Sequence, residues 1–176
     1  MRLGPLLAAP VFLPLMLAGI APVAAAAPRA TVFVAPIDLF DTAADQRPAV
    51  VADQRLWLER AAARIRADLD HAGPVKAVGT AETRAGMAPI TNDYDHPSTC
   101  PECLATAARK AHAGFLFVGT LHRVSDLIVY LKGYLLDLRS GHELMGRTFE
   151  VKSDDHIMLD RAADRMAAAI ERHLPH

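Results

Sequence analysis

The sequence lacks the short motifs that point most directly to catalysis. It contains no Gly-x-Ser-x-Gly motif, no phosphate-binding loop and no dinucleotide-binding fingerprint. Only two of its 176 residues are cysteines, so thiol chemistry is limited to one pair of side chains. The sequence therefore favours a non-enzymatic protein, and no cofactor is expected.

An excess of charge of either sign is also missing. The chain has 19 Lys and Arg residues against 20 Asp and Glu residues. No basic stripe interleaved with aromatic residues is present, so a nucleic-acid partner is not expected. After residue 30, no apolar run without charges is long enough to cross a membrane.

One long apolar run is present, at the start of the chain. Arg2 supplies a positive charge, residues 3–21 are almost wholly apolar, and residues 24–26 are three alanines. This pattern is typical of a secretory signal peptide, although the run is also long enough for a membrane anchor. Its prolines and its alanine-rich end favour cleavage after Ala26. We therefore expect a signal peptide at residues 1–26 and one domain at 27–176, periplasmic or secreted.

The first half of this domain alternates between strand and helix patterns. Residues 31–37 are a short apolar run typical of a strand buried on both faces. A polar loop is expected at residues 38–48. The helix that follows is expected to end at Gly73, before a second strand at residues 75–78. Its buried face is predicted from residues spaced four, three and four apart: Leu58, Ala62, Ile65 and Leu69.

Residues 79–99 are rich in Gly, Pro, Thr and Asp, and they predict an irregular segment. Thr99 and Glu102 have the spacing of a capping box and predict the start of an alanine-rich helix. Ser153 or Asp154 is expected to cap the last helix. The buried stripe of that helix is predicted to be Leu159, Ala163, Met166, Ile170 and Leu174.

Three strands joined by two tight turns are expected at residues 114–152. The turns lie at residues 125–126 and 139–141. The first of these strands is apolar on both faces and is therefore expected to be central in the sheet. The element order is strand, helix, strand, helix, three strands, helix. This order predicts an α/β fold with a mixed sheet of about five strands and helices packed on it.

The pattern resembles the N-terminal domain of TolB and related periplasmic modules such as the curli secretion lipoprotein. The likeness is carried by Ala-His-Ala-Gly-Phe-Leu-Phe-Val-Gly-Thr-Leu at residues 111–121 and Leu-Leu-Asp-Leu-Arg-Ser-Gly at residues 135–141. The chain also resembles a family of uncharacterised secreted proteobacterial proteins, a domain of unknown function. The resemblance implies a periplasmic interaction module that is not an enzyme. Unlike in TolB, no propeller is expected to follow the domain.

Cys100-Pro-Glu-Cys103 is the one motif in the sequence that suggests a specific chemistry. Residues three apart in the first turn of a helix lie within disulfide reach, and a helix N-terminus favours a thiolate. The pair is compatible with a structural disulfide, with redox activity or with metal binding. A thioredoxin-like site is disfavoured because about twenty loop residues separate the motif from the preceding strand, and because no proline lies between Pro101 and Pro175.

A metal site would need further ligands beside the two cysteines. His96 and His112 flank the motif and could complete a zinc set with Cys100 and Cys103, although the spacing is not that of a standard finger. Asp93 and Asp95 could instead contribute to a site for a hard cation. The alternative to such a site is a solvated polar loop, and no metal is expected.

Partner binding is the remaining possibility. Tyr130 and Tyr134 are predicted to share one face of the second meander strand, where tyrosines would suit an interface. The third strand, at residues 142–152, is a candidate sheet edge that includes Arg147. We expect an unknown periplasmic protein partner. The alternative is a thiol–disulfide or metal-handling protein centred on the cysteine pair.

Overall fold

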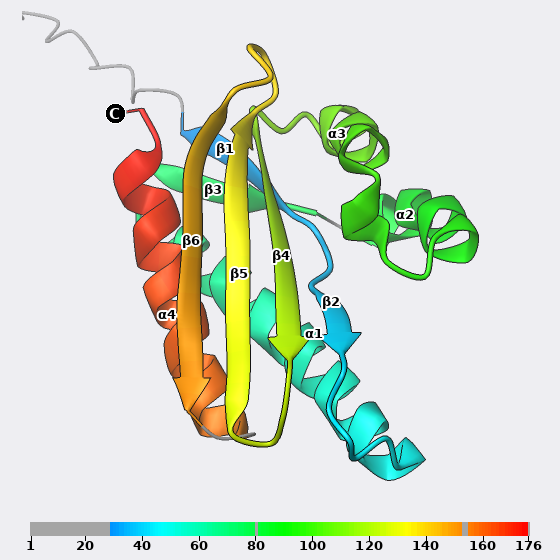
Figure 1. Cartoon of the computed structure of the whole chain (residues 1–176). Helices are drawn as coiled ribbons and strands as arrows, with labels where there is room; N and C mark the ends of the chain where they lie inside the picture. Colours follow the sequence, from blue (N-terminus) through cyan, green and yellow to red (C-terminus); the bar gives the residue numbers. More distant parts are fainter. Residues whose placement is uncertain (1–28, 80, 153–154, 176) are drawn as a thin grey trace, which may run out of the picture.

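The structure is a computed structural model, and it describes residues 29–79, 81–152 and 155–175. The expected signal peptide and the two expected cap residues, Ser153 and Asp154, lie outside these ranges. The described elements form one mixed sheet with helices on both faces (Figure 1). In chain order they are β1 (Ala30–Val34), β2 (Asp38–Asp41), α1 (Pro48–His71), β3 (Val75–Val78), α2 (Ala81–Asp93), the 3-10 turn η1 (Pro97–Thr99), α3 (Pro101–Lys110), β4 (Phe115–Arg123), β5 (Ile128–Asp137), β6 (Glu143–Lys152) and α4 (His156–His173).

The sheet has the strand order β3-β1-β4-β5-β6, and β2 also pairs with β4. β1 and β2 both run parallel to β4, and they are separated where Pro36 interrupts the chain. β4, β5 and β6 are antiparallel neighbours. The predicted meander and the central place of its first strand are therefore confirmed, in a sheet of six described strands.

α1 and α4 cover one face of the sheet and build the larger core. The four predicted residues of α1 and the five of the last helix are all buried there. Arg60 bonds Asp160 and Arg64 bonds Asp164, and the two residues of each pair are 100 positions apart in the sequence. Because both pairs advance by one helical turn together, the two helices run in the same direction side by side.

The opposite face is covered only in part. α2, η1 and α3 pack over the β1 side of the sheet and leave the front of β5 and β6 open (Figure 1). A second, smaller core forms beneath them. Its largest members are Phe33, Met87, Leu104, Leu116, Val118 and Leu138.

Four local expectations were wrong. The loop expected at residues 38–48 contains β2, a strand with too few apolar residues to show a pattern. The irregular segment expected at residues 79–99 contains α2, whose pattern is obscured by Pro89 within the helix.

The two expected caps also differ from the structure. Thr99 lies in η1 and its hydroxyl donates to the His96 carbonyl, so Cys100 is the N-cap residue and no capping box forms. Asp155 caps α4 in place of its two predecessors, because its carboxylate accepts the Ile157 N–H at 2.9 Å.

Candidate functional site

The two cysteines form a disulfide at the start of α3. Their Cα atoms are 5.3 Å apart, and the bond links the N-cap residue Cys100 to Cys103 in the first turn. Zinc binds cysteine as the thiolate. In this oxidised form neither sulfur is a thiolate. The bond therefore favours the structural interpretation of the motif over metal binding.

The histidines expected to complete a metal set lie apart from the disulfide. His96 precedes η1, and its ring stacks on Phe40 with centroids 4.1 Å apart. His112 lies beyond the other end of α3 and is exposed, with a positive φ of 56°. Within residues 29–79, 81–152 and 155–175, no three His, Cys, Asp or Glu side chains, including Asp93 and Asp95, gather where a metal could be held.

Tyr130 and Tyr134 share the open face of the sheet, as predicted. Both are half-buried and alternate with inward-facing residues along β5. Neighbouring β4 places His122 opposite Tyr130. Burial raises the pKa of the Tyr134 hydroxyl, helped by nearby Glu143 and Asp38.

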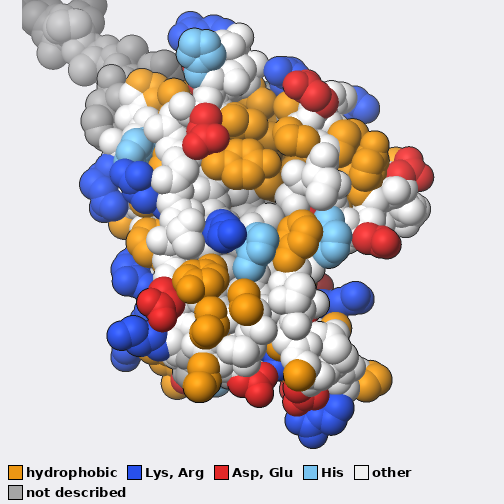
Figure 2. Space-filling model, in the orientation of Figure 1, with side chains coloured by type: hydrophobic (Ala, Val, Ile, Leu, Met, Phe, Trp, Pro, Cys, Tyr) orange, Lys and Arg blue, Asp and Glu red, His pale blue; other side chains and the backbone are white. Residues whose placement is uncertain are grey.

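A stack of rings crosses this open face. Phe40 of β2 lies between His96 and His122, with ring centroids 4.1 and 5.0 Å away. Burial lowers the pKa of His122, and the charge of Lys132 lowers it further. Figure 2 shows histidine and hydrophobic side chains gathered on this face, over β2, β4 and β5. The surface is suited to contact with another molecule, because aromatic groups are enriched at interfaces.

Arg147 does not join this surface. It lies opposite Gly133, which shares with Leu131 and Leu135 the face of β5 that packs on the α1–α4 core. Its guanidinium lies 3.4 Å from Nε2 of His173 on α4. The structure therefore places Arg147 and the two tyrosines on opposite faces of the sheet.

The direction of the backbone N–H and C=O groups of β5 determines which backbone groups of β6 point away from the sheet. The Leu138 N–H donates to the Gly114 carbonyl, and the Ile128 carbonyl accepts the Val124 N–H. Even-numbered residues of β5 therefore bond towards β4. Because backbone groups alternate between the two edges of a strand, odd-numbered residues of β5 bond towards β6.

β6 follows the same alternation and ends the sheet. Arg147 lies opposite Gly133 in the register, so odd-numbered residues of β6 bond to β5. The N–H groups of Gly146, Thr148 and Glu150 then point away from the sheet. No described strand pairs with this side of β6. A ten-residue strand thus offers a long open edge, as expected for residues 142–152.

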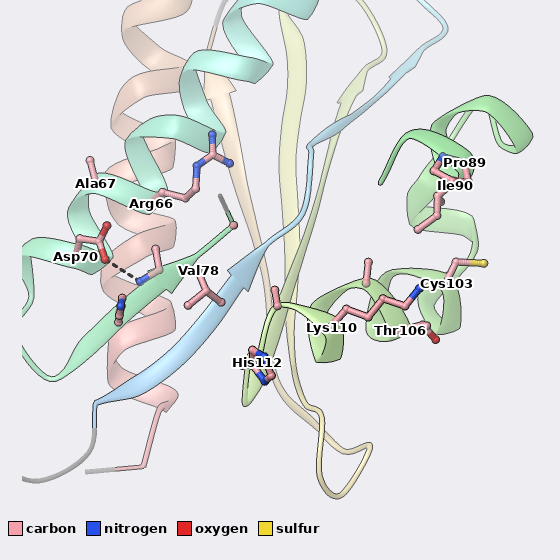
Figure 3. A pocket seen from close by; sticks show the side chains of 15 residues that line it. Arg66, Ala67, Asp70, Val78, Pro89, Ile90, Cys103, Thr106, Lys110 and His112 are labelled. Carbon is pink, nitrogen blue, oxygen red and sulfur yellow. Dashed lines mark hydrogen bonds between the residues drawn. The ribbon is translucent and has the colours of Figure 1, made fainter. Parts of the chain in front are cut away.

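The opposite edge, β3, is shorter and is partly blocked. β3 has four residues, and the Asp70 carboxylate of α1 accepts the outward N–H of Ala77 at 2.8 Å (Figure 3). A cavity of about 1120 Å³ lies beside this edge, between α1 and the α2–α3 layer. Lys76, Lys110 and His112 are exposed at its rim.

Arg123 is a buried charge that the sequence did not indicate. Only 1% of its side chain is exposed. Its guanidinium bonds both carboxylate oxygens of Asp41 at 3.1 and 3.2 Å, the Asp45 carbonyl at 2.9 Å and Asp126 at 2.5 Å. The network joins the ends of β2 and β4 to the turn after β4. A single arginine near a predicted turn carries no signal of burial in sequence.

Solved structures with a similar fold include lipoproteins and a TolB protein. The LpoB C-terminal domain from Salmonella enterica is 11% identical over 72% of this chain and 84% of that chain, with a TM-score of 0.49. Lipoprotein GNA1162 from Neisseria meningitidis is 14% identical over 83% of this chain and 99% of that chain, with a TM-score of 0.49.

TolB, which the sequence was expected to resemble, is also among the similar solved structures. TolB from Acinetobacter baumannii is 11% identical over 82% of this chain but only 28% of its own, with a TM-score of 0.45. No curated protein matches the chain. None of the described helices combines the length and the apolar character needed to cross a membrane.

A family profile described as "Protein of unknown function (DUF2380)" matches residues 30–170, which is most of the chain. The chain therefore belongs to the DUF2380 family of proteins of unknown function.

Proposed function

We propose that this protein is an exported, non-enzymatic binding or assembly module that takes a protein partner at the free edge of β6. Export rests on the N-terminal pattern of residues 1–26. Its test is the mass of the protein recovered from the periplasm or the medium, which should begin at Ala27. Recovery of intact Met1 in the membrane fraction would contradict export by cleavage.

The open edge of β6 is the observation that supports the binding role. An unpaired strand edge binds an extended segment by main-chain hydrogen bonds, which is a common mode of peptide recognition. Exposed charges on β6, including Arg147, Glu150 and Lys152, protect this edge from non-specific pairing with the strands of other proteins. β3 is a poorer edge because Asp70 already bonds its Ala77 N–H.

The experiment removes one outward donor of β6. Thr148→Pro deletes an N–H that makes no bond to β5, so the sheet should remain folded. Thr148→Val is the matched control, because it changes the side chain but keeps the donor. A partner should be retained by wild type and by Thr148→Val and lost from Thr148→Pro, with folding checked by circular dichroism. Retention of every partner by folded Thr148→Pro would reject this edge.

The disulfide supports a second candidate, thiol–disulfide exchange. Cys100 and Cys103 lie at a helix N-terminus, where a thiolate is favoured after reduction. A Cys100→Ser, Cys103→Ser protein separates the two proposals. Loss of a thiol-exchange activity from a folded variant would support exchange, whereas unchanged partner binding would support the edge.

A further inference from the structure

We propose that the segment received by β6 is acidic: β6 and the neighbouring side of α4 form a docking site for an extended polypeptide with a carboxylate at every second residue. This inference rests on the proposed binding role of β6. It names the chemistry of the partner, which the open edge alone does not.

The charges of α4 are separated onto two sides of the helix. Asp160 and Asp164 face α1, where Arg60 and Arg64 bind them. These two carboxylates are therefore neutralised within the protein. They do not offset positive charge on the other side of the helix.

The other side of α4 is basic and adjoins β6. The Arg165 guanidinium lies 4.9 Å from the ring centre of Phe149 on β6. Arg161 and Arg172 are one and two turns from Arg165 along the same side, and all three are exposed. Lys and Arg side chains gather along the margin of Figure 2 where Figure 1 shows β6 and α4.

β6 itself is mixed in charge. Arg147 and Lys152 are exposed, but so are Glu143 and Glu150. Glu150 and Lys152 lie opposite Tyr130 and Ile128 on the open face, away from α4, whereas Arg147 lies on the α4 side. Positive charge thus dominates on the α4 side of the edge. Because side chains alternate between the faces of a strand, every second residue of an added strand would face these arginines.

A second copy of this chain does not suit the site. Pairing two β6 edges around a twofold axis would bring the arginines of both α4 helices to the same side of the joined sheet. Like charges held close together disfavour such pairing. An acidic strand instead gains both main-chain hydrogen bonds and charge complementarity.

The probe is a synthetic ten-residue peptide that alternates threonine and glutamate. We expect it to shift the backbone NMR signals of β6 and α4 in ¹⁵N-labelled protein, with weaker binding as salt is raised. Arg161→Glu, Arg165→Glu, Arg172→Glu should weaken binding by about tenfold or more, because several exposed ion pairs each add modestly. The control makes the same charge change at Arg55, Lys76 and Arg139, and should bind as wild type does.

Two further peptides separate this inference from the proposed function. A threonine–glutamine peptide that binds equally well would overturn the acidic preference while leaving strand addition intact. A threonine–glutamate peptide methylated on alternate backbone nitrogens keeps its charge but loses donors. Equal binding of that peptide would overturn strand addition. The inference would be overturned if the protein did not bind the unmethylated acidic peptide. It would also be overturned if the protein bound vesicles of anionic phospholipid and no peptide.

Discussion

At the scale of single residues, Arg123 has the most demanding environment. A buried charge is tolerated only when partners replace the water it has lost. Arg123 obtains them from Asp41, Asp126 and a backbone carbonyl, which come from segments about 80 residues apart or from its own turn. Its role is to hold the ends of β2 and β4 together.

We expect Arg123→Met to lower the free energy of unfolding by about 3–5 kcal/mol, because it leaves the Asp41 carboxylate, 8% exposed, without its cation. Urea denaturation measures the loss. Asp126→Asn is the comparison: Asp126 is 67% exposed, so its ion pair should contribute about 1 kcal/mol or less. Equal losses in the two variants would show that burial does not determine the contribution.

His122 predicts a pH dependence of stability. Burial and Lys132 lower its pKa in the folded state, so the unfolded chain binds the proton more readily. The contribution of neutral His122 to the free energy of unfolding is therefore fully present above the pKa of histidine in the unfolded chain, about 6.5. It is lost as the pH falls through the lower pKa of the folded state.

We expect the melting temperature of His122→Gln to fall less than that of wild type between pH 7 and pH 5. Lys132→Ala should raise the pKa of His122 in an NMR titration, because one repulsive charge is removed. Parallel melting profiles for wild type and His122→Gln would remove His122 as a source of the acid sensitivity.

At the scale of elements, two paired glycines determine how β4 and β5 pack. Gly119 and Gly133 lie opposite each other, and the ring of Phe117 covers both. A Cβ on Gly133 would lie 2.5 Å from Phe117 Cε2 and 3.0 Å from Met166 Cε. The missing side chains therefore make room for one aromatic ring in the core beneath α4.

We expect Gly133→Ala to cost about 1–3 kcal/mol of stability, the usual range for overpacking a core. Gly114→Ala is the matched control, because its nearest atom would be an ordinary contact 3.6 Å away. Thermal unfolding of both variants measures the difference. A neutral Gly133→Ala would mean that the Phe117 ring moves aside freely.

Sequence patterns predicted those elements whose burial repeats regularly. The meander was recognisable because Val129, Leu131 and Leu135 recur at every second or fourth position, with Tyr130, Lys132 and Tyr134 between them. α2 was missed because its described large apolar residues, Met87 and Ile90, are too few to form a stripe. The stack of His96, Phe40 and His122 could not be predicted, because its rings come from three separate segments.

The disulfide is an element-scale constraint with a small energetic effect. Cys100 and Cys103 are three residues apart, so their bond restricts the unfolded chain very little. We expect Cys100→Ser, Cys103→Ser to remain folded and to lose about 2 kcal/mol or less in denaturation experiments. Two free thiols in freshly exported protein trapped with an alkylating agent would contradict the oxidised pair.

At the scale of the whole molecule, one sheet separates two cores of unequal size. α1 and α4 are long, pack against each other and are joined by two ion pairs. α3 has ten residues and lies over the smaller core. The α2–η1–α3 layer therefore has fewer contacts to lose when it detaches.

We expect the α2–η1–α3 layer to open before the rest of the fold, and hydrogen exchange to detect this. Amides of Leu104 and Ala108 in α3 should exchange faster than those of Phe117 in β4 and Met166 in α4, because local opening needs less free energy where less apolar surface is buried. Mass spectrometry of exchanged peptides measures the order. Simultaneous exchange of all four positions would show that the two cores unfold as one unit.

β1 begins and α4 ends at the same end of the molecule (Figure 1). Neighbouring ends are the condition that favours circular permutation. A short linker from residue 175 to residue 29 could close the described chain into a ring without disturbing either core. New termini could then be opened at the exposed turn of Arg139, Ser140 and Gly141, which would make β6 the first strand of the chain and leave its free edge unchanged.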